Sequence, residues 1–432
     1  MILGLGLGLP FQAANGDDDM AWTRPSDWTA MPMPTAEMIY ILSAVTNDAS
    51  NYVALSATVT GGFDVDWGDG DITSHASAAK AEHLYDYADA GLGALTTAGY
   101  KQALIKITPT SGGNQITAWD LGQKHSRTNL GAHVQPWLDI AINTPAATTI
   151  AIRSTVETRW VERINFIAIG AITSMSGLFQ NCNSLQSVSF PTGSLASVTN
   201  MTNVFNSCVS LPEVTFPAGS LAAVTGLNSA FSTCSRMRRI AFPAGSLSLV
   251  TSATGTFSSC QTLKTISWPT GALAAVTTIA NMFQNCLSLQ EMSFPAGALA
   301  ALTTLDTSFG VCTCLRKVTF PAGSLTLLTT LATCFSNCVS LEEVIFPSGA
   351  LTLVVTTTNT FNACAALKRI QNCTIPVSFT IATQSFGGAQ LDEIYTALPI
   401  AVAKTITITT NHGAVDDTPL IATAKGWTVT GT

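Results

Sequence analysis

The chain has 432 residues and a formal net charge of −7, and charged residues make up 10% of it, against about 25% in average soluble proteins. Nucleic-acid binding needs clustered lysine and arginine. We find no such cluster along the sequence and expect no nucleic-acid partner. The length allows two or three domains, and the scarcity of charge predicts a surface of Ser, Thr, Asn, Gln, Ala and Gly.

Residues 1–35 begin with a short apolar run interrupted by glycines. It lacks the positively charged start of a signal peptide and is too short to span a bilayer, so a signal sequence is the less favoured alternative and we expect no membrane insertion. An apolar terminus needs a surface to pack on, and we therefore expect an assembly or docking tail. Its apolar docking residues are Ile2, Leu3, Leu5, Leu7, Leu9 and Phe11.

Residues 36–110 predict a small β-sandwich. The stretch FDVDWGDGD predicts a strand that ends in a tight turn. Two interpretations of Asp66, Asp69 and Asp71 stay open: the side chains cap backbone N–H groups, which we favour, or they hold calcium. The segment resembles a PKD-type domain, with an unusually long insertion, and the resemblance implies a spacer or adhesion module. The matching residues are Trp67–Gly70, His83, Tyr85, Gly99 and Tyr100.

Residues 111–172 alternate apolar and polar residues and imitate one coil of the repeat that follows them. Val161, Ile164 and Phe166 take the places of its Leu, Val and Phe. A solenoid needs atypical end coils that cover its core and its unpaired strands. We therefore expect an irregular N-terminal cap here.

Residues 173–373 repeat one pattern every 26 residues. The Phe of the pattern recurs at Phe179, Phe205, Phe231, Phe257, Phe283, Phe309, Phe335 and Phe361. Each is followed three positions later by Cys182, Cys208, Cys234, Cys260, Cys286, Cys312, Cys338 or Cys364. The next element, L-x-x-V-x-F-P, predicts a short strand with one buried face. A Pro-Gly turn and a short helical turn are expected before the next Phe. No repeat can bury its apolar faces alone, so the coils must stack into a solenoid with a parallel sheet.

The cysteines at this one repeat position favour a packing role over a disulfide or metal role, because free Cys is a small, readily buried residue. Only Cys312 and Cys314 approach the spacing of a zinc pair. Cys314, Cys334 and Cys373 lie off the repeat position. We expect reduced thiols, no metal and no cofactor.

Two outward positions on the predicted strand differ from coil to coil. The first alternates in charge, which favours a device that fixes the register of the coils, and its charged members are Glu213, Arg239, Glu291, Lys317, Glu343 and Arg369. The second is small from Ser189 to Thr319, with Ala241 among its residues, and ends at Ile345. It is a candidate contact surface, with a merely solvated sheet face as the alternative; the candidate contact residues are Ser189, Thr215, Ser267, Ser293 and Thr319.

The repeat, read with the segment VTNMTNVFNSC, resembles the BspA-like leucine-rich repeats over residues 173–373. Such repeats occur in surface proteins of bacteria and protists and in phage-encoded structural proteins. The resemblance implies recognition or scaffolding and no reaction. The PAGS-type turn and the strict repeat length depart from the family pattern and suggest recent duplication.

Residues 374–432 predict a C-terminal α/β cap. LDEIYTALP is typical of a helix and KTITITT of a strand, while TPLIATAKGWTVTG predicts a helix closed by Gly426 and a last strand. The segment ATAKGWTVTG resembles the ends of other phage and bacterial leucine-rich proteins.

The sequence contains no H-E-x-x-H, G-x-S-x-G or P-loop motif, and its five histidines are scattered. The fold class we expect is mainly β, a leucine-rich-repeat solenoid preceded by a PKD-like sandwich, and we expect a protein that is not an enzyme.

We favour a virion structural protein of a bacteriophage: a tail fibre, a receptor-binding protein or a capsid decoration. It would meet other virion proteins through its N-terminus in a multi-copy assembly, and a host-surface glycan or protein through the solenoid. A secreted or surface-anchored bacterial adhesin is the alternative, with an extracellular or cell-surface location. A polysaccharide-active enzyme is the third reading.

Overall fold

The computed structural model describes residues 22–47, 51–127, 135–152, 158–381 and 385–431. The chain divides into two compact units, of which the first is Met1–Ile169 with Gln186–Val188 and the second is Gly170–Leu185 with Ser189–Thr432. The predicted docking residues, Ile2 to Phe11, lie outside the described residues. In the described part of the chain, no helix is both long and apolar enough to cross a membrane.

The first unit is built of two β-sheets. Its strands are β1 (Met38–Val45), β2 (Tyr52–Val59), β3 (Phe63–Asp66), β4 (Ile72–His75), β5 (Lys80–Leu84), β6 (Lys101–Pro109), β7 (Ile116–Asp120), β8 (Trp137–Thr144), β9 (Thr149–Ala151), β10 (Arg163–Ile169) and β11 (Ser187–Ser189). One sheet has the order β11-β10-β8-β1-β6-β3-β4, and the other has the order β5-β2-β7-β9. The pairs β1–β6, β1–β8, β3–β6, β3–β4, β2–β5 and β2–β7 are antiparallel, and the pairs β8–β10 and β7–β9 are parallel.

Strands from residues 111–172 complete these two sheets. We expected that segment to be a cap of the solenoid, and this stays a prediction. Its strands β7 and β8 pair with strands of residues 36–110, and β10 pairs with β8. The alternating pattern carried no information on which partner each strand would choose. The five domain ranges themselves stay predictions.

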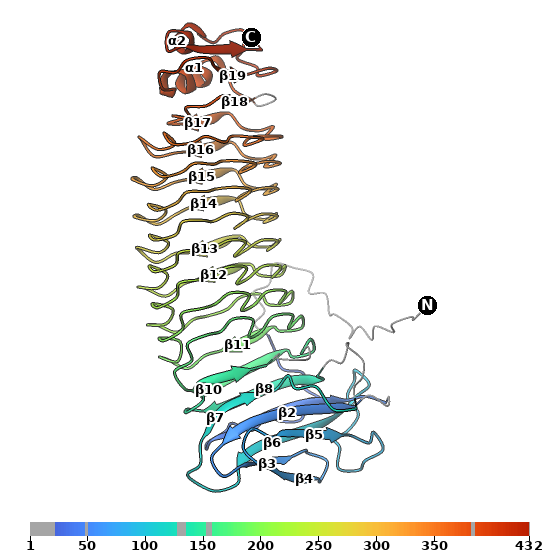
Figure 1. The fold of residues 1–432 in the computed structure, drawn as a ribbon. Helices are drawn as coiled ribbons and strands as arrows, with labels where there is room; N and C mark the ends of the chain where they lie inside the picture. The colour runs from blue at the N-terminus through green and yellow to red at the C-terminus, as the bar shows by residue number, and fades with distance from the viewer. Residues whose placement is uncertain (1–21, 48–50, 128–134, 153–157, 382–384, 432) are drawn as a thin grey trace. The chain divides into compact units, whose positions relative to one another are not determined.

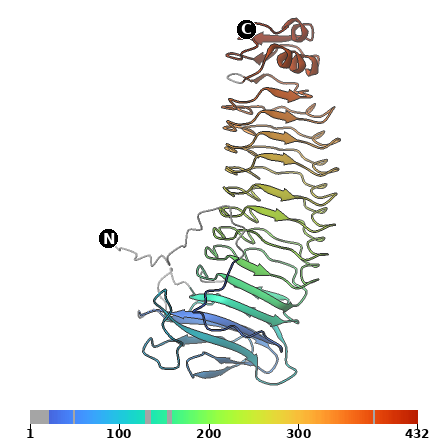
Figure 2. The same cartoon turned by 180° about the vertical axis from the view of Figure 1, so that it is seen from behind.

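The second unit is a solenoid whose coils are 26 residues long, as the sequence predicted. Its strands are β12 (Arg239–Ala241), β13 (Thr265–Ser267), β14 (Glu291–Ser293), β15 (Lys317–Thr319), β16 (Glu343–Ile345) and β17 (Arg369–Gln371). The pairs β12–β13 and β14 to β17 are parallel and in register. Figure 1 shows these coils stacked one above another with their strands on one side, and Figure 2 shows the same stack from behind.

The predicted strand at Leu211–Phe216 is reduced to a single bridge between Thr215 and Ala241. Pro212 has no N–H, so it cannot donate a hydrogen bond to the neighbouring coil. Proline at this position therefore shortens the parallel sheet.

The predicted helical turn before each Phe-x-x-Cys is wrong. In the coil of Cys208, the N–H of Val204 donates to Met201 O (3.1 Å) and the N–H of Cys208 donates to Phe205 O (3.0 Å). Asn203 and Ser207 have φ values of 56° and 63°, which a right-handed helix excludes and a type II turn requires. These turns leave alternate N–H groups free to bond the next coil, as Asn203 N–H does to Asn228 O at 2.9 Å.

The solenoid core is a column of aromatic rings. Phe205, Phe231, Phe257 and their equivalents are fully buried, and successive rings stack nearly parallel with centroids 4.9–5.8 Å apart. This stacking separation is within the range that aromatic pairs favour. The repeated Phe therefore sets both the core and the spacing of the coils.

The C-terminal segment contains the expected elements. They are α1 (Gly388–Ala397), β19 (Lys404–Thr407), α2 (Leu420–Thr423) and β20 (Trp427–Thr430), and the segment has one further strand that was not expected, β18 (Phe379–Thr380). The strands form a parallel sheet in the order β18-β19-β20. Gly426 follows α2 with φ +83°, which is the left-handed conformation that commonly ends a helix.

Candidate recognition surface

The outward side chains of the solenoid strands form two columns that continue from coil to coil. We call the first the charge ladder: Glu213, Arg239, Glu291, Lys317, Glu343 and Arg369. We call the second the small-residue strip: Ser189, Thr215, Ser267, Ser293 and Thr319. Within β12–β13 and within β14 to β17 the parallel strands are in register, so each column is continuous within these two groups of coils.

The charge ladder is held by ion pairs between neighbouring coils. Arg239 Nε lies 2.6 Å from Glu213 Oε2. Glu343 contacts both of its neighbours, with Lys317 Nζ at 2.7 Å and Arg369 Nη1 at 3.1 Å. The hydrogen bond from Lys317 holds the pKa of Glu343 below its ordinary value, and the positive charges of Lys317 and Arg369 add to this effect.

Glu291 and Lys317 lie in register, as the alternation predicted, but the ion pair that the structure gives Lys317 is with Glu343. Arg369 has a second partner that the sequence did not indicate: its Nε and Nη2 each donate to a carboxylate oxygen of Glu393 in α1 at 3.1 Å. The last rung of the ladder is thereby joined to the C-terminal helix.

The small-residue strip is open to solvent. Ser189, Thr215, Ser267 and Ser293 are exposed, and Thr319 is half-buried. Short side chains on a rigid sheet lose little side-chain entropy on binding, and their hydroxyls both donate and accept hydrogen bonds. The strip can therefore approach a partner surface closely.

A third column stands immediately before the strands, and the sequence reasoning missed it because it considered only positions inside them. We call it the edge column; its charged members are Arg238, Lys264, Arg316, Glu342 and Lys368. Lys368 Nζ pairs with Glu342 Oε2 at 2.8 Å. The signal that could have found the column is the same 26-residue spacing, applied one position earlier.

The repeat cysteines have a structural role in the core. Seven thiols, from Cys208 to Cys364, donate to the carbonyl of the Phe 29 residues earlier, with S···O distances of 2.9–3.2 Å. Burial raises the pKa of each of these thiols, to about 12 for Cys338. A protonated, buried thiol is a poor nucleophile and metal ligand. Of the cysteines off the repeat position, Cys334 and Cys373 are buried and Cys314 is exposed.

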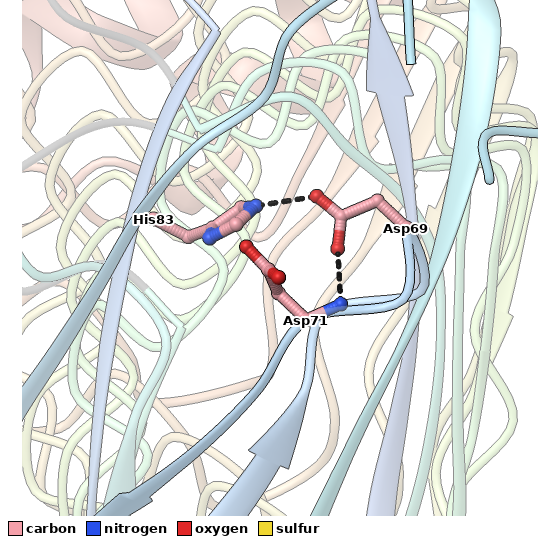
Figure 3. Close-up of side chains that lie close together, drawn as sticks. All are labelled: Asp69, Asp71 and His83. Carbon is pink, nitrogen blue, oxygen red and sulfur yellow. Dashed lines mark hydrogen bonds and ion pairs between the residues drawn. The ribbon is translucent and has the colours of Figure 1, made fainter. Parts of the chain in front are cut away.

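The aspartates of the WGDG turn cap its backbone, as we favoured. Asp66 Oδ1 accepts from Gly68 N–H (3.0 Å), and Asp69 Oδ1 accepts from Asp71 N–H (3.1 Å). Figure 3 shows Asp69 also bonded to His83, with Oδ2 and Nε2 2.6 Å apart. Ligand atoms of Asp69, Asp71 and His83 lie within 4.8 Å of one another, which is close enough to consider a cation. Since Asp69 already bonds both neighbours, we assign the cluster to the turn.

The family comparison agrees with this architecture. A model of the BspA type leucine rich repeat region matches residues 173–302 and 278–405, with six copies. No curated protein matches the chain. Among solved structures, a leucine-rich repeat protein from Bacteroides ovatus is 15% identical, with 74% of this chain and 96% of that one covered and a TM-score of 0.27.

Two further structures are similarly distant. A leucine rich cell surface protein from Faecalibacterium prausnitzii is 17% identical, with 74% and 91% covered and a TM-score of 0.25. The pneumococcal vaccine antigen PcpA is 12% identical, with 66% and 74% covered and a TM-score of 0.25. At these values the similarities carry no functional information.

Proposed function

The chain belongs to the BspA-type leucine-rich repeat family, and from this premise we propose that it is a non-enzymatic binding protein whose strand face contacts the partner. The observation that carries the proposal is the small-residue strip, in which Ser293 and Thr319 lie in register on neighbouring strands and the coil of Thr319 is joined to the next by an ion pair. Such a face is preorganised, and preorganisation lowers the entropy cost of binding.

The strand face gives little support to an enzymatic reading. A polysaccharide hydrolase needs two carboxylates that face the scissile bond. Glu213 and Glu343 lie in the same column, five coils apart, and each is engaged with a cation of a neighbouring coil. Carboxylates paired with cations in this way hold the register of the coils and do not face one scissile bond together.

The biological setting we propose is the virion of a bacteriophage, where the protein would act as a tail fibre, receptor-binding protein or capsid decoration. The apolar, glycine-interrupted run from Ile2 to Phe11 supports it as a docking segment for other virion proteins. The PKD-like segment would serve as a spacer. In a multi-copy assembly, weak individual contacts of the strand face would add up through effective concentration. A secreted or surface-anchored bacterial adhesin is the alternative setting.

The test of the binding function uses the purified full chain, labelled with a fluorophore, and a panel of bacterial cells. Ser293→Arg with Thr319→Arg places bulky groups on the strip. Ser248→Arg with Thr326→Arg makes the same change in exposed loops outside the strands. We expect the strip variant to lose about tenfold or more in cell affinity, and the loop variant to keep wild-type affinity. Wild-type protein that binds no cells, or equal losses in both variants, would refute the proposal.

The setting is tested separately by mass spectrometry of purified virions and of cell envelopes from the source culture. Recovery of the chain from virions supports the phage setting. Recovery from the envelope alone would replace it with the adhesin.

A further inference from the structure

Two adjacent coils of the solenoid, residues 226–277, carry charge of a single sign. They contain four cationic residues and no Asp or Glu, in a chain whose net charge is −7. We call Arg236, Arg238, Arg239 and Lys264 the basic patch. The three arginines are close together in the sequence, although they are fewer than the clustered Lys and Arg that nucleic-acid binding needs. Lys264, 25 positions or more away, joins them only in the fold.

The parallel stacking brings these residues to the same end of neighbouring strands. Lys264 N–H donates to Arg238 O at 2.8 Å. The two cationic side chains therefore project from backbone positions that are hydrogen-bonded neighbours on adjacent coils. Arg239 begins β12 and is paired in register with Thr265 of β13. Adjacent strands lie about 4.8 Å apart, which places the side chains of the patch within reach of one ligand.

The patch is open to solvent. Arg236, Arg239 and Lys264 are exposed, and Arg238 is half-buried. The side chain of Arg239 stays 56% exposed although it contacts Glu213. Exposed guanidinium and ammonium groups can meet a large ligand without further loss of core packing.

The corresponding positions near the C-terminal end are arranged differently. There, Arg316 and Lys317 are followed by Glu342 and Glu343, and these by Lys368 and Arg369, so that the sign alternates. In the basic patch, Lys264 follows Arg238 with the same sign. Like charges opposite each other on neighbouring strands are destabilising, and the same fold places acids at such positions elsewhere. The patch therefore carries a stability cost that a ligand of opposite charge would offset.

We propose that the basic patch binds an anionic polysaccharide, an assignment that rests on the binding function proposed above. Guanidinium groups recognise carboxylate, sulfate and phosphate through paired hydrogen bonds. Next to them in register stand Thr215, Ala241 and Ser267. Their short side chains admit a sugar ring, and the hydroxyls of Thr215 and Ser267 can bond to its hydroxyls.

A polysaccharide fits this surface better than a nucleic acid. Single-stranded nucleic acids are bound by exposed aromatic rings that stack on bases. Here Phe242 is buried and Trp268 is half-buried, and the two rings stack on each other with their centroids 5.3 Å apart. Duplex binding needs a longer basic stripe than four residues, and Glu213 and Glu291 flank the patch on either side.

The experiment measures binding of the full chain to immobilised polymers by biolayer interferometry. Polygalacturonate offers carboxylates, dextran sulfate offers sulfates, and neutral dextran is the uncharged reference. The patch variant is Arg236→Gln, Arg238→Gln and Lys264→Gln. The matched control, Arg316→Gln, Lys317→Gln and Lys368→Gln, changes the net charge equally on other coils.

We expect wild type to bind at least one anionic polymer and not dextran, and to lose affinity as salt screens the charges. The stronger of the two polymers identifies the anionic group. The patch variant should lose about tenfold or more in affinity, and the control about twofold or less. If the triple variant unfolds on heating at a lower temperature than wild type, Lys264→Gln alone replaces it, with an expected loss of about threefold.

Absence of binding to both anionic polymers overturns the proposal, as do equal losses in the patch and control variants. Duplex DNA that competes as well as the polymers would assign the patch to nucleic acid instead. Salt-sensitive self-association that the patch variant abolishes would assign it to an acidic segment of a second copy. A chain that binds cells but no anionic polymer leaves the proposed binding function intact and refutes the ligand assigned to the basic patch. A chain that binds anionic polymers but no cells supports the basic patch and refutes the proposed binding of cells by the strand face.

Discussion

The solenoid and the N-terminal unit are held together over very different distances along the chain. In the solenoid, hydrogen bonds such as those of Thr277 and Cys286 join residues 26 or 29 positions apart. In the N-terminal unit, Trp28 bonds to Tyr100 and Arg24 to Asp139, across 72 and 115 positions. Damage to a solenoid should thus stay near the altered coil, whereas damage to the N-terminal unit should spread through it.

The largest effect is expected from Phe283→Ala. This ring is fully buried between Phe257 and Phe309, at centroid distances of 5.8 and 5.3 Å. Its loss should cost about 4 kcal/mol of unfolding free energy, measured by urea denaturation. Hydrogen exchange should rise in the adjacent coils and not in the N-terminal unit. Val339→Ala, at a 45% exposed position, is the control, and faster exchange throughout the chain would contradict the locality.

Asp139→Asn should have the next largest effect. The Asp139 side chain is fully buried and receives Arg24 Nε at 2.9 Å and Arg163 Nε at 2.8 Å. Removing the charge should destabilise the N-terminal unit by about 3 kcal/mol, with exchange rising across both of its sheets. Asp64→Asn, whose bond to Ser74 is exposed, should change little. If hydrogen exchange in Asp139→Asn rises only next to residue 139, the N-terminal unit responds locally as the solenoid does, and the predicted difference between the units is wrong.

Thiol labelling tests the rigidity of the solenoid core without a mutation. Burial disfavours the thiolate, so the pKa of Cys338 in the folded state, about 12, lies above its unfolded value. The stabilisation from keeping the thiol protonated is complete below the unfolded pKa, about 8.5, and is lost as pH rises through the folded one. At pH 8.5, iodoacetamide should modify exposed Cys314 about a hundredfold faster than Cys338, a ratio of about 2.7 kcal/mol. Equal rates by mass spectrometry would contradict the rigid core.

The smallest effect is expected from Lys264→Glu. The substitution gives Arg238 a neighbour of opposite sign, as Glu342 has in Lys368. Stability of the solenoid should rise by about 0.3 kcal/mol, measured as a shift of the urea midpoint, while affinity for anionic polysaccharide falls. Glu342→Lys is the reverse control and should lower the midpoint. A midpoint that falls in Lys264→Glu would contradict the cost assigned to the basic patch.

Most of the solenoid could be predicted from the sequence, because a strict spacing of Phe and Cys fixes which residues meet. What failed there depended on the backbone. Pro212 lacks the backbone N–H that a strand needs, and the apolar pattern gives no sign of this loss. The positive φ values of Asn203 and Ser207 make turns of a segment whose apolar spacing suggested a helix.

The N-terminal unit was harder to predict, since alternation in β8 and β10 indicates strands but not their partners. The caps of Asp66 and Asp69 could be predicted because they act within two residues. Two longer-range contacts could not be predicted, because nothing in the local sequence indicates them: Arg24 with Asp139, and Trp22 with Glu162. The basic patch was partly predictable. The 26-residue spacing of Arg238 and Lys264 is visible in the sequence, but both residues lie one position before the expected strand.

The alternating signs near the C-terminal end limit how this chain can change in length. Adding or deleting one repeat by recombination keeps every Phe and Cys in place, because the unit length is constant. It also brings two rungs of equal sign together, as deletion of the coil with Glu342 and Glu343 would bring Arg316 and Lys317 against Lys368 and Arg369. Gain or loss of coils in pairs avoids this repulsion. The length of the solenoid should therefore change during evolution by two repeats at a time.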